Sequence, residues 1–231
     1  MADRPTGDGV SRETPRPPSE AAAVFGARLD LAERYAERLC TDGVERGLIG
    51  PREAPRVWDR HLLNCAVVGE LIPVGSRVID VGSGAGLPGL ALAIARPDLV
   101  VTLLEPMGRR VTFLLEVLAD LEIAGVDVQR GRADEAPRGR WQAATARAVA
   151  PIERLVEWSL PLLEPDGCLL ALKGKSARDE LTAAETALRR LGASRWDVRD
   201  VGVGVIPVAT TVVRVWLDRT SEDRRHVEST G

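Results

Sequence analysis

The sequence RVIDVGSGAGLPGLALAIARPDLVVTLLE, residues 77–105, decides the fold of this chain. It opens with a short apolar run at 78–81, whose length and β-branched residues are typical of a buried parallel strand. An apolar helix is predicted at 90–94, and a second β-branched run ends at Glu105. Between the first strand and the helix, glycine recurs at Gly82, Gly84, Gly86 and Gly89. This unit favours nucleoside binding, because the helix start offers free N–H groups and the acid can bind a ribose diol.

The glycines fit two registers, which predict different ligands. Residues 84–89 match G-x-G-x-x-G, the dinucleotide fingerprint, and an acid follows about 20 residues further on, as that motif requires. Residues 80–86 instead match D-x-G-x-G-x-G, the first motif of S-adenosylmethionine-dependent methyltransferases. Asp80 suits a sulfonium or an ammonium better than a pyrophosphate, and Pro88 removes an N–H that a pyrophosphate would need. We therefore favour the methyl-donor register. Its cofactor-binding candidates are Asp80, Gly82, Gly84 and Gly86.

Length and composition indicate one domain of moderate size with an appendage, at 231 residues and 45% hydrophobic. No apolar run reaches the roughly 18–20 residues that span a bilayer, and the polar, proline-rich start is not a secretory signal, so we expect a cytoplasmic protein without membrane contact. The net charge of −3 predicts no global affinity for nucleic acid. The three cysteines are odd in number and scattered, without the spacing of metal ligands or of a disulfide framework, so we expect no metal and three buried thiols.

The order of predicted elements divides the chain into four parts. We expect a disordered tail at 1–18, a helical cap at 19–74, a donor-binding domain at 75–218 and a polar tail at 219–231. The cap has helical periodicity at 19–40 and 54–71. In the donor-binding domain, strands alternate with helices, which predicts a parallel sheet covered on both faces. The last two strands, at 195–203 and 210–217, have no helix between them, so one of them must run antiparallel to its neighbour. We predict an α/β fold with a seven-stranded, mostly parallel, Rossmann-like methyltransferase sheet, a terminal antiparallel strand and an N-terminal helical extension.

Polar residues at the ends of the predicted strands supply the other candidate site residues, because ligands of open α/β sheets bind at the carboxyl ends of strands. Glu105 is placed to bind the ribose, although it could be a solvated acid before a helix. Asp134 can accept a bond from an adenine amino group, with the Ala133 N–H beside it, or cap a helix instead. Arg147, set between two alanines, can hold the cofactor carboxylate or the substrate. His61 lies within a predicted helix, where a lone histidine is more often structural than functional.

Five segments together resemble the 16S ribosomal RNA guanine-N7 methyltransferase family, also called glucose-inhibited division protein B. They are VIDVGSGAGLPGLALAI, LLEP followed by MGRRVTFL, GRADE, TARAV and ALKGK, and the similarity runs from about Val57 to Leu217. The resemblance implies cofactor contacts at Gly82, Leu87, Ala133, Asp134 and Arg147. It implies RNA-facing positions at Arg60, His61 and Lys173, and it makes Arg147 and Lys173 candidates for positioning the reactants. The implied partner is small-subunit ribosomal RNA or the 30S particle. This chain has Glu105 where the family commonly has Asp, which keeps the charge.

The chemistry of guanine N7 agrees with the residue types present. N7 carries a lone pair and no proton, so it needs no general base to attack a sulfonium methyl group. Methylation of cytosine C5 would need a thiolate in a loop, whereas Cys168 is predicted inside a strand. The N/D-P-P-Y/F motif of exocyclic-amine methyltransferases is absent after the fourth strand. Two alternatives stay open from the sequence: a nicotinamide-dependent reductase that uses Gly84, Gly86 and Gly89, and a non-enzymatic nucleoside-binding interaction module.

Overall fold

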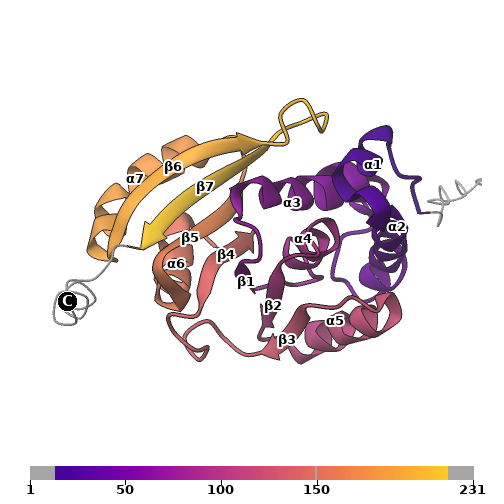
Figure 1. The fold of residues 1–231 in the computed structure, drawn as a ribbon, viewed down its shortest axis with the longest axis horizontal. Coiled ribbons are helices and arrows are strands. Elements are labelled where there is room, and N and C mark those ends of the chain that lie inside the picture. The colour runs from indigo at the N-terminus through magenta and orange to yellow at the C-terminus, as the bar shows by residue number, and fades with distance from the viewer. Residues whose placement is uncertain (1–13, 149, 218–231) are drawn as a thin grey trace, which may run out of the picture.

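A seven-stranded sheet forms the centre of the computed structural model, which describes residues 14–148 and 150–217 (Figure 1). The strands are β1 (Arg77–Val81), β2 (Val100–Glu105), β3 (Val126–Arg130), β4 (Trp141–Arg147), β5 (Leu163–Lys173), β6 (Ala193–Val201) and β7 (Thr210–Leu217). They lie in the order β3-β2-β1-β4-β5-β7-β6. Strands β1 to β5 are parallel, whereas β7 pairs antiparallel with both β5 and β6. The predicted fold class, including the antiparallel terminal strand, is confirmed.

Helices cover both faces of the sheet, as the apolar character of the central strands requires. The helices after the cap are α4 (Gly89–Ala95), α5 (Gly108–Leu121), α6 (Ile152–Ser159) with the 3₁₀ turn η6 (Leu160–Leu162), and α7 (Ala177–Arg190). One apolar core joins the sheet to α4, α5 and the cap, and a second core joins the other face to α6 and α7. Both faces of β1 are therefore buried, which explains why its residues from Val78 to Val81 are apolar apart from Asp80.

The cap, residues 19–74, is built from short helical pieces. They are α1 (Ser19–Phe25), η1 (Gly26–Arg28), α2 (Leu29–Arg38), η2 (Leu39–Gly43), η3 (Ala54–Arg56), η4 (Val57–Leu63), α3 (Asn64–Ala66) and η5 (Val67–Leu71). The single helix predicted at 19–40 is wrong: at Gly26 the backbone takes φ +53°, which ends α1. The helix predicted at 54–71 is a continuous helical stretch of mixed 3₁₀, π and α turns.

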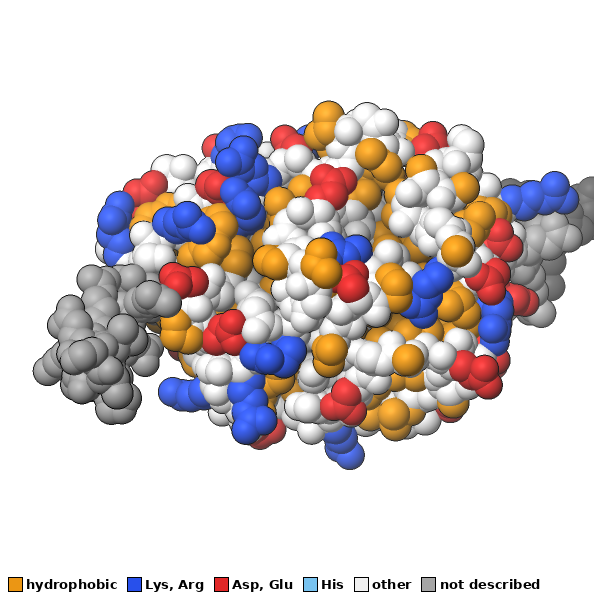
Figure 2. All heavy atoms as spheres, in the orientation of Figure 1, with side chains coloured by type: hydrophobic (Ala, Val, Ile, Leu, Met, Phe, Trp, Pro, Cys, Tyr) orange, Lys and Arg blue, Asp and Glu red, His pale blue; other side chains and the backbone are white. Residues whose placement is uncertain are grey.

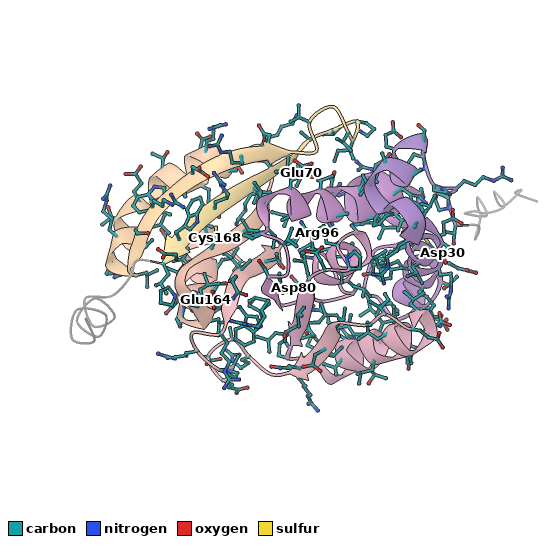
Figure 3. The ribbon with its side chains drawn as sticks, in the orientation of Figure 1. Asp30, Glu70, Asp80, Arg96, Glu164 and Cys168 are labelled. Carbon is teal, nitrogen blue, oxygen red and sulfur yellow. The ribbon has the colours of Figure 1, made fainter. Side chains whose placement is uncertain are left out.

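The cap is bonded to the far end of the sheet as well as packed on its face. Glu70 accepts a hydrogen bond from the Gly202 N–H at 3.0 Å, just beyond β6 (Figure 3). The Thr210 hydroxyl at the start of β7 donates to the carbonyl of Asn64 at 3.1 Å. The cap is therefore fixed relative to the carboxyl ends of the strands.

Only part of the two predicted tails lies within the described residues. The indole N–H of Trp58 donates to the carbonyl of Pro15 at 2.8 Å, so the disorder predicted for residues 1–18 does not hold for this part of the segment. Residues 1–13 of that segment and the whole of the polar tail predicted at 219–231 lie outside the described residues.

The apolar character of the helices and the distribution of surface charge bear on contact with membranes and with nucleic acid. Within 14–148 and 150–217, no helix has the length and apolar character needed to cross a membrane. Basic and acidic side chains are interspersed over the face shown in Figure 2. The mixture on this face agrees with the small net charge of the chain, which by itself predicts no global affinity for an anionic polymer.

Strand β1 and helix α4 meet so closely at Gly89 that no side chain fits there. A Cβ atom on Gly89 would lie 2.5 Å from Leu103 Cδ2 and 2.7 Å from Asp80 Cβ. The same closeness lets the Gly89 N–H donate to Asp80 Oδ2 at 3.0 Å. The last glycine of the motif therefore serves helix-to-strand packing.

We expect Gly89→Ala to lower the free energy of unfolding by about 1–3 kcal/mol, the usual range for overpacking a core. The control is Gly174→Ala, because Gly174 has no atom within 4 Å of the added Cβ and no positive φ. It should change the stability by less than about 0.5 kcal/mol. Urea unfolding followed by circular dichroism measures both; equal midpoints for the two variants would contradict the close approach at Gly89.

Candidate functional site

Two adjoining cavities open at the carboxyl edge of the parallel strands, where the chain leaves β1 for β2 on one side and β4 lies on the other. The smaller has a volume of about 140 Å³ and the larger of about 460 Å³. Gly82 and Pro106 line both cavities, so the two meet at the glycine loop. Open α/β sheets bind ligands at this position, and the larger cavity falls within the roughly 300–1,000 Å³ of small-molecule sites.

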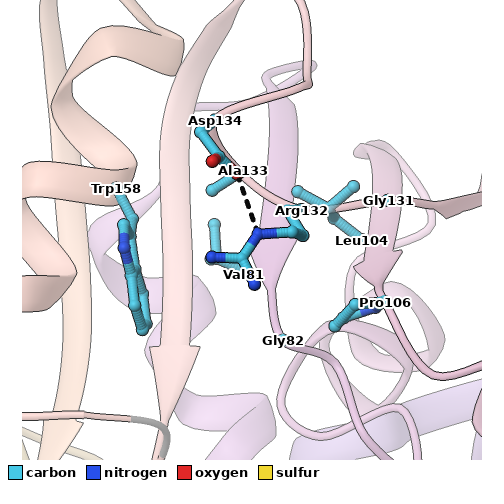
Figure 4. Close-up of a pocket in the computed structure, with 9 residues that line it drawn as sticks. All are labelled: Val81, Gly82, Leu104, Pro106, Gly131, Arg132, Ala133, Asp134 and Trp158. Carbon is cyan, nitrogen blue, oxygen red and sulfur yellow. Dashed lines mark hydrogen bonds and ion pairs between the residues drawn. The ribbon is translucent and has the colours of Figure 1, made fainter.

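The smaller cavity lies between the loop after β3 and helix α6 (Figure 4). Its lining residues are Val81, Gly82, Leu104, Pro106, Gly131, Arg132, Ala133, Asp134 and Trp158. Ala133 and Asp134 lie here, as the prediction of an adenine site requires; the Asp134 carboxylate is exposed and pairs with Arg132 Nε at 3.2 Å. Trp158 forms the opposite wall in Figure 4. This position was not predicted, because from the sequence Trp158 is one apolar residue among others in a helical segment.

The larger cavity lies between the glycine loop, the start of α5 and the cap. Its lining residues are Leu48, Ile49, Gly82, Ser83, Gly84, Ala85, Leu87, Glu105, Pro106, Met107, Arg110, Arg147 and Ala148. The structure thus brings Gly82, Gly84, Leu87, Glu105 and Arg147 together around one space. Arg110 joins them without having been predicted, and its Nη1 lies 3.6 Å from Glu105 Oε2.

The cap supports the glycine loop through Tyr35. Its hydroxyl donates to the carbonyl of Ala85 at 2.7 Å, and the side chain is fully buried. Gly86 has φ +97°, and a Cβ there would lie 2.8 Å from the Tyr35 hydroxyl. The predicted cofactor residue Gly86 therefore lines neither cavity, and its missing side chain leaves the space that Tyr35 occupies.

Glu105 is buried and both of its carboxylate oxygens accept backbone N–H groups. Oε2 accepts from Gly84 and Oε1 from Met107, each at 2.9 Å, and the residue is 1% exposed. It thereby ties the glycine loop to the start of α5. Its contact with a ribose stays a prediction, and any such contact shares the carboxylate with these two N–H groups.

Asp80 lies beneath the glycine loop at the centre of the molecule (Figure 3). Its Oδ1 accepts from the Thr145 hydroxyl on β4 at 2.9 Å, and its Oδ2 accepts from the Gly89 N–H. Asp80 is fully buried and lines neither cavity. The expectation that its carboxylate lies beside the sulfonium is therefore corrected: the side chain holds the loop from below. Burial raises the pKa of Asp80 to about 6, although the hydrogen bonds from Thr145 and Gly89 oppose that shift.

Arg147 ends β4 and lines the larger cavity, and its guanidinium contacts the cap. It donates to the Arg60 carbonyl and to Cys65 Sγ, each at 3.2 Å, and it contacts His61 Nδ1. His61 is only 4% exposed, whereas the Arg60 side chain is 52% exposed and pairs with Glu53. Of these predicted RNA-facing residues, the structure places Arg60 at the surface and His61 inside. The roles of both stay predictions.

Lys173 lies at the end of β5, outside both cavities. Its Nζ donates to the Ala150 carbonyl at 2.9 Å and to Glu180 Oε1 at 2.8 Å. The same Glu180 oxygen accepts from the Ile152 N–H at 2.7 Å. Lys173 therefore joins the start of α6 to α7, and its ammonium already has two partners within the protein.

The thiols are unpaired, and burial raises the pKa of all three. Cys65 is buried, but the expectation of three buried thiols is wrong for Cys40 and Cys168, which are partly exposed. For Cys168, burial raises the pKa to about 12. None of the three is a reactive thiolate at neutral pH. Within the described part of the chain, no group of three His, Cys, Asp or Glu residues is placed to hold a metal.

Comparisons with known proteins show which family the sequence is similar to. The model of the GidB family, described as rRNA small subunit methyltransferase G, matches residues 28–203. Ribosomal RNA small subunit methyltransferase G of Salinispora tropica is 54% identical over 221 residues, which cover 91% of this chain and 91% of the relative. The protein of the same name from Rhodococcus jostii is 57% identical over 200 residues, which cover 84% of this chain and 87% of the relative. These similarities give no support to the nicotinamide-dependent or the non-enzymatic alternative.

Two solved structures illustrate the shared fold. The M. jannaschii protein TYW2 in complex with AdoMet has a TM-score of 0.54 at 13% identity, covering 69% of this chain and 74% of its own. A putative S-adenosyl-L-methionine-dependent methyltransferase from Methanococcus maripaludis has a TM-score of 0.54 at 14% identity, covering 81% of this chain and 94% of its own. At these identities the likeness shows the fold alone.

The raised pKa of Asp80 predicts a specific dependence of stability on pH. Between its unfolded value of about 4 and the folded value of about 6, the folded state holds the extra proton, so the free energy of unfolding falls as the pH rises. Two pKa units correspond to about 3 kcal/mol, which Asp80→Asn should remove from the pH profile. Urea unfolding across this range, without added ligand, compares the variant with the wild type and with the exposed control Asp59→Asn. A profile for Asp80→Asn that runs parallel to the wild type would contradict this assignment.

Proposed function

The chain belongs to the GidB family, rRNA small subunit methyltransferase G, and on this premise we propose that it methylates N7 of a guanosine in small-subunit ribosomal RNA. Membership makes it an S-adenosyl-L-methionine-dependent enzyme whose substrate is ribosomal RNA. The atom that receives the methyl group, the 30S particle as the form of the substrate, and work in the cytoplasm are parts of our proposal.

The residues at the two cavities fit the methyl donor. Gly82 and Gly84 have φ angles of +73° and +59°, so the loop exposes its backbone beside both cavities without side chains in the way. We assign the smaller cavity to the adenine, between Trp158 and Ala133 with Asp134 as the acceptor. We assign the larger cavity to the ribose and the amino-acid part, with Glu105 and Arg147 as the polar partners. The donor, when bound, supplies an electrophilic methyl group on a sulfonium.

The observation that carries the N7 assignment is the wall of the larger cavity. Among the described residues that line it, the only carboxylate, that of Glu105, accepts hydrogen bonds on both oxygens, and none is a cysteine or a histidine. A hydroxyl or carbon acceptor needs a base or a thiolate in this place, whereas guanine N7 attacks with its own lone pair and loses no proton. Catalysis then consists of alignment, which supplies up to about 7–11 kcal/mol in favourable cases.

Because the N7 lone pair must stay free to attack, it also limits how the protein can recognise the guanine. An arginine that bonded both O6 and N7 would block the nucleophile. We therefore propose that the base is recognised through O6 and its Watson–Crick edge, after it has been turned out of a loop of the RNA. Arg60, which is half exposed beside the site, is our candidate for an RNA contact.

The test is methyl transfer to small subunits that lack the modification. Purified enzyme is incubated with donor carrying a labelled methyl group and either 30S particles or naked 16S RNA. Nuclease digestion and mass spectrometry should then find labelled N7-methylguanosine. Label on another base, or on another guanine atom, would overturn the N7 proposal while leaving the family assignment in place. Comparing the two substrates decides between particle and naked RNA.

We expect Ala133→Leu to weaken binding of S-adenosylhomocysteine by about 10- to 200-fold, because extra methylene groups in a fitted pocket cost about 1–3 kcal/mol. Ala133 lines the smaller cavity and is only partly buried, so the fold should tolerate the change. The matched control is Ala183→Leu on the exposed side of α7. Calorimetric titration measures both, and unchanged affinity in Ala133→Leu would remove the adenine from this cavity.

A further inference from the structure

The guanidinium of Arg147 is held by one short stretch of the cap. Nη1 donates to the Arg60 carbonyl and to Cys65 Sγ, and Nη2 contacts Nδ1 of His61. The acceptors are thus a backbone carbonyl, a thiol and an imidazole, none of which carries a negative charge. None of these three acceptors neutralises the guanidinium, and Arg147 lines the larger cavity, so its positive charge is available to a ligand there.

The contact with Arg147 fixes the proton arrangement of His61. A guanidinium only donates hydrogen bonds, so Nδ1 of His61 must present its lone pair and the proton must lie on Nε2. Nε2 lies 3.3 Å from Glu53 Oε2, in an orientation that does not make an aligned hydrogen bond. Burial, followed by the charge of Arg147, lowers the pKa of His61 to about 4, so the ring is neutral and keeps this lone pair at neutral pH.

We propose that His61 is a positioning residue for methyl transfer, which acts by holding the Arg147 guanidinium at the wall of the larger cavity. This inference rests on the proposed function, since it concerns the site of methyl transfer. An arginine side chain has many rotamers, and a guanidinium that is already anchored loses less of this rotamer entropy when the reactants bind. His61 itself is 4% exposed and does not line the cavity, so it acts through Arg147 and not by touching the reactants.

Two substitutions of equal size separate this role from simple packing. His61→Asn keeps an acceptor near the position of Nδ1, whereas His61→Leu has the same shape without one. Both lose the contact with Glu53 and leave a similar gap. If His61 only fills space, the two variants have the same methyl-transfer activity. If its lone pair holds Arg147, His61→Asn keeps this activity and His61→Leu loses it.

The first experiment measures methyl transfer by these variants, alone and combined with Arg147→Met. His61→Leu should lower kcat/KM by about 10- to 100-fold, the size expected from a small misplacement in a site that works by alignment. His61→Asn should stay within a few-fold of the wild type, with the same midpoint of thermal unfolding as His61→Leu. In the Arg147→Met background, neither substitution should lower activity further, because the residue through which His61 acts is gone. Equal losses in the Asn and Leu variants, or a further loss in the double variant, would overturn the proposal.

Two further measurements do not depend on catalysis, so they keep the inference separable from the proposed function. Arg147→Met should change the Kd for S-adenosylhomocysteine. His61→Leu should change this Kd in the same direction, whereas His61→Asn should leave it unchanged. Nitrogen NMR with isotope-labelled histidine, with His226→Gln to assign the signals, should show His61 protonated on Nε2 alone at neutral pH. A proton on Nδ1 would refute the role of His61 even if N7-methylguanosine is formed. If the enzyme forms no N7-methylguanosine, these two measurements still decide the role of His61.

Discussion

The buried carboxylate of Asp80 is the interaction on which the site depends. It joins β1 to the start of α4 through the Gly89 N–H and to β4 through the Thr145 hydroxyl. A carboxylate without partners in such a place would cost several kcal/mol, so the loop above it cannot move away without leaving that group unpaired. The absence of a side chain at Gly89 makes this possible, since a Cβ atom would overlap Asp80. The glycine loop is therefore fixed from below before any ligand binds.

The cap completes the same site from the other side. Tyr35 bonds the carbonyl of Ala85 in the loop, Leu48 and Ile49 line the larger cavity, and His61 contacts Arg147. Because these contacts come from separate helical pieces, the cap must fold onto the sheet for the cavity to have its walls. Its bonds to the β6–β7 connection, through Glu70 and Asn64, fix it at the carboxyl edge of the strands. The helical extension thus supplies walls of the larger cavity as well as a cover for one face of the sheet.

Local sequence predicted the features that depend on local periodicity and turn chemistry. The strand predicted at 78–81 is observed at Arg77–Val81. The glycine loop and Glu105 follow β1 and end β2, as the pattern predicted, and they meet because strand ends in a parallel sheet share one edge. Contacts between distant residues leave no such pattern: Tyr35 and Ala85 are 50 positions apart, and His61 and Arg147 are 86 apart. Asp80 shows the same limit, since the motif located the residue correctly but not the direction of its carboxylate. That direction follows from Thr145 on a strand that is its neighbour only in space.

The lack of a free base and of a thiol among the described residues that line the larger cavity has a chemical consequence for an enzyme that handles a reactive methyl group. An electrophilic methyl can be lost to any nearby lone pair, so a site that protects it needs walls whose lone pairs are already engaged or absent. The larger cavity comes close to this condition: its carboxylate accepts two backbone N–H groups, its arginines have no basic lone pair, and its Ser83 hydroxyl donates to the Asp80 carbonyl. The thioether of Met107, a weak nucleophile, is the exception among the described lining side chains. Cys65, whose Sγ accepts a hydrogen bond from Arg147, is buried, and burial raises its pKa, so it is a thiol at neutral pH. The first competent lone pair to reach the methyl group is then the one that the RNA brings. The lack of a general base therefore agrees with a ring nitrogen as the acceptor, and it also makes transfer of the methyl group selective for the RNA.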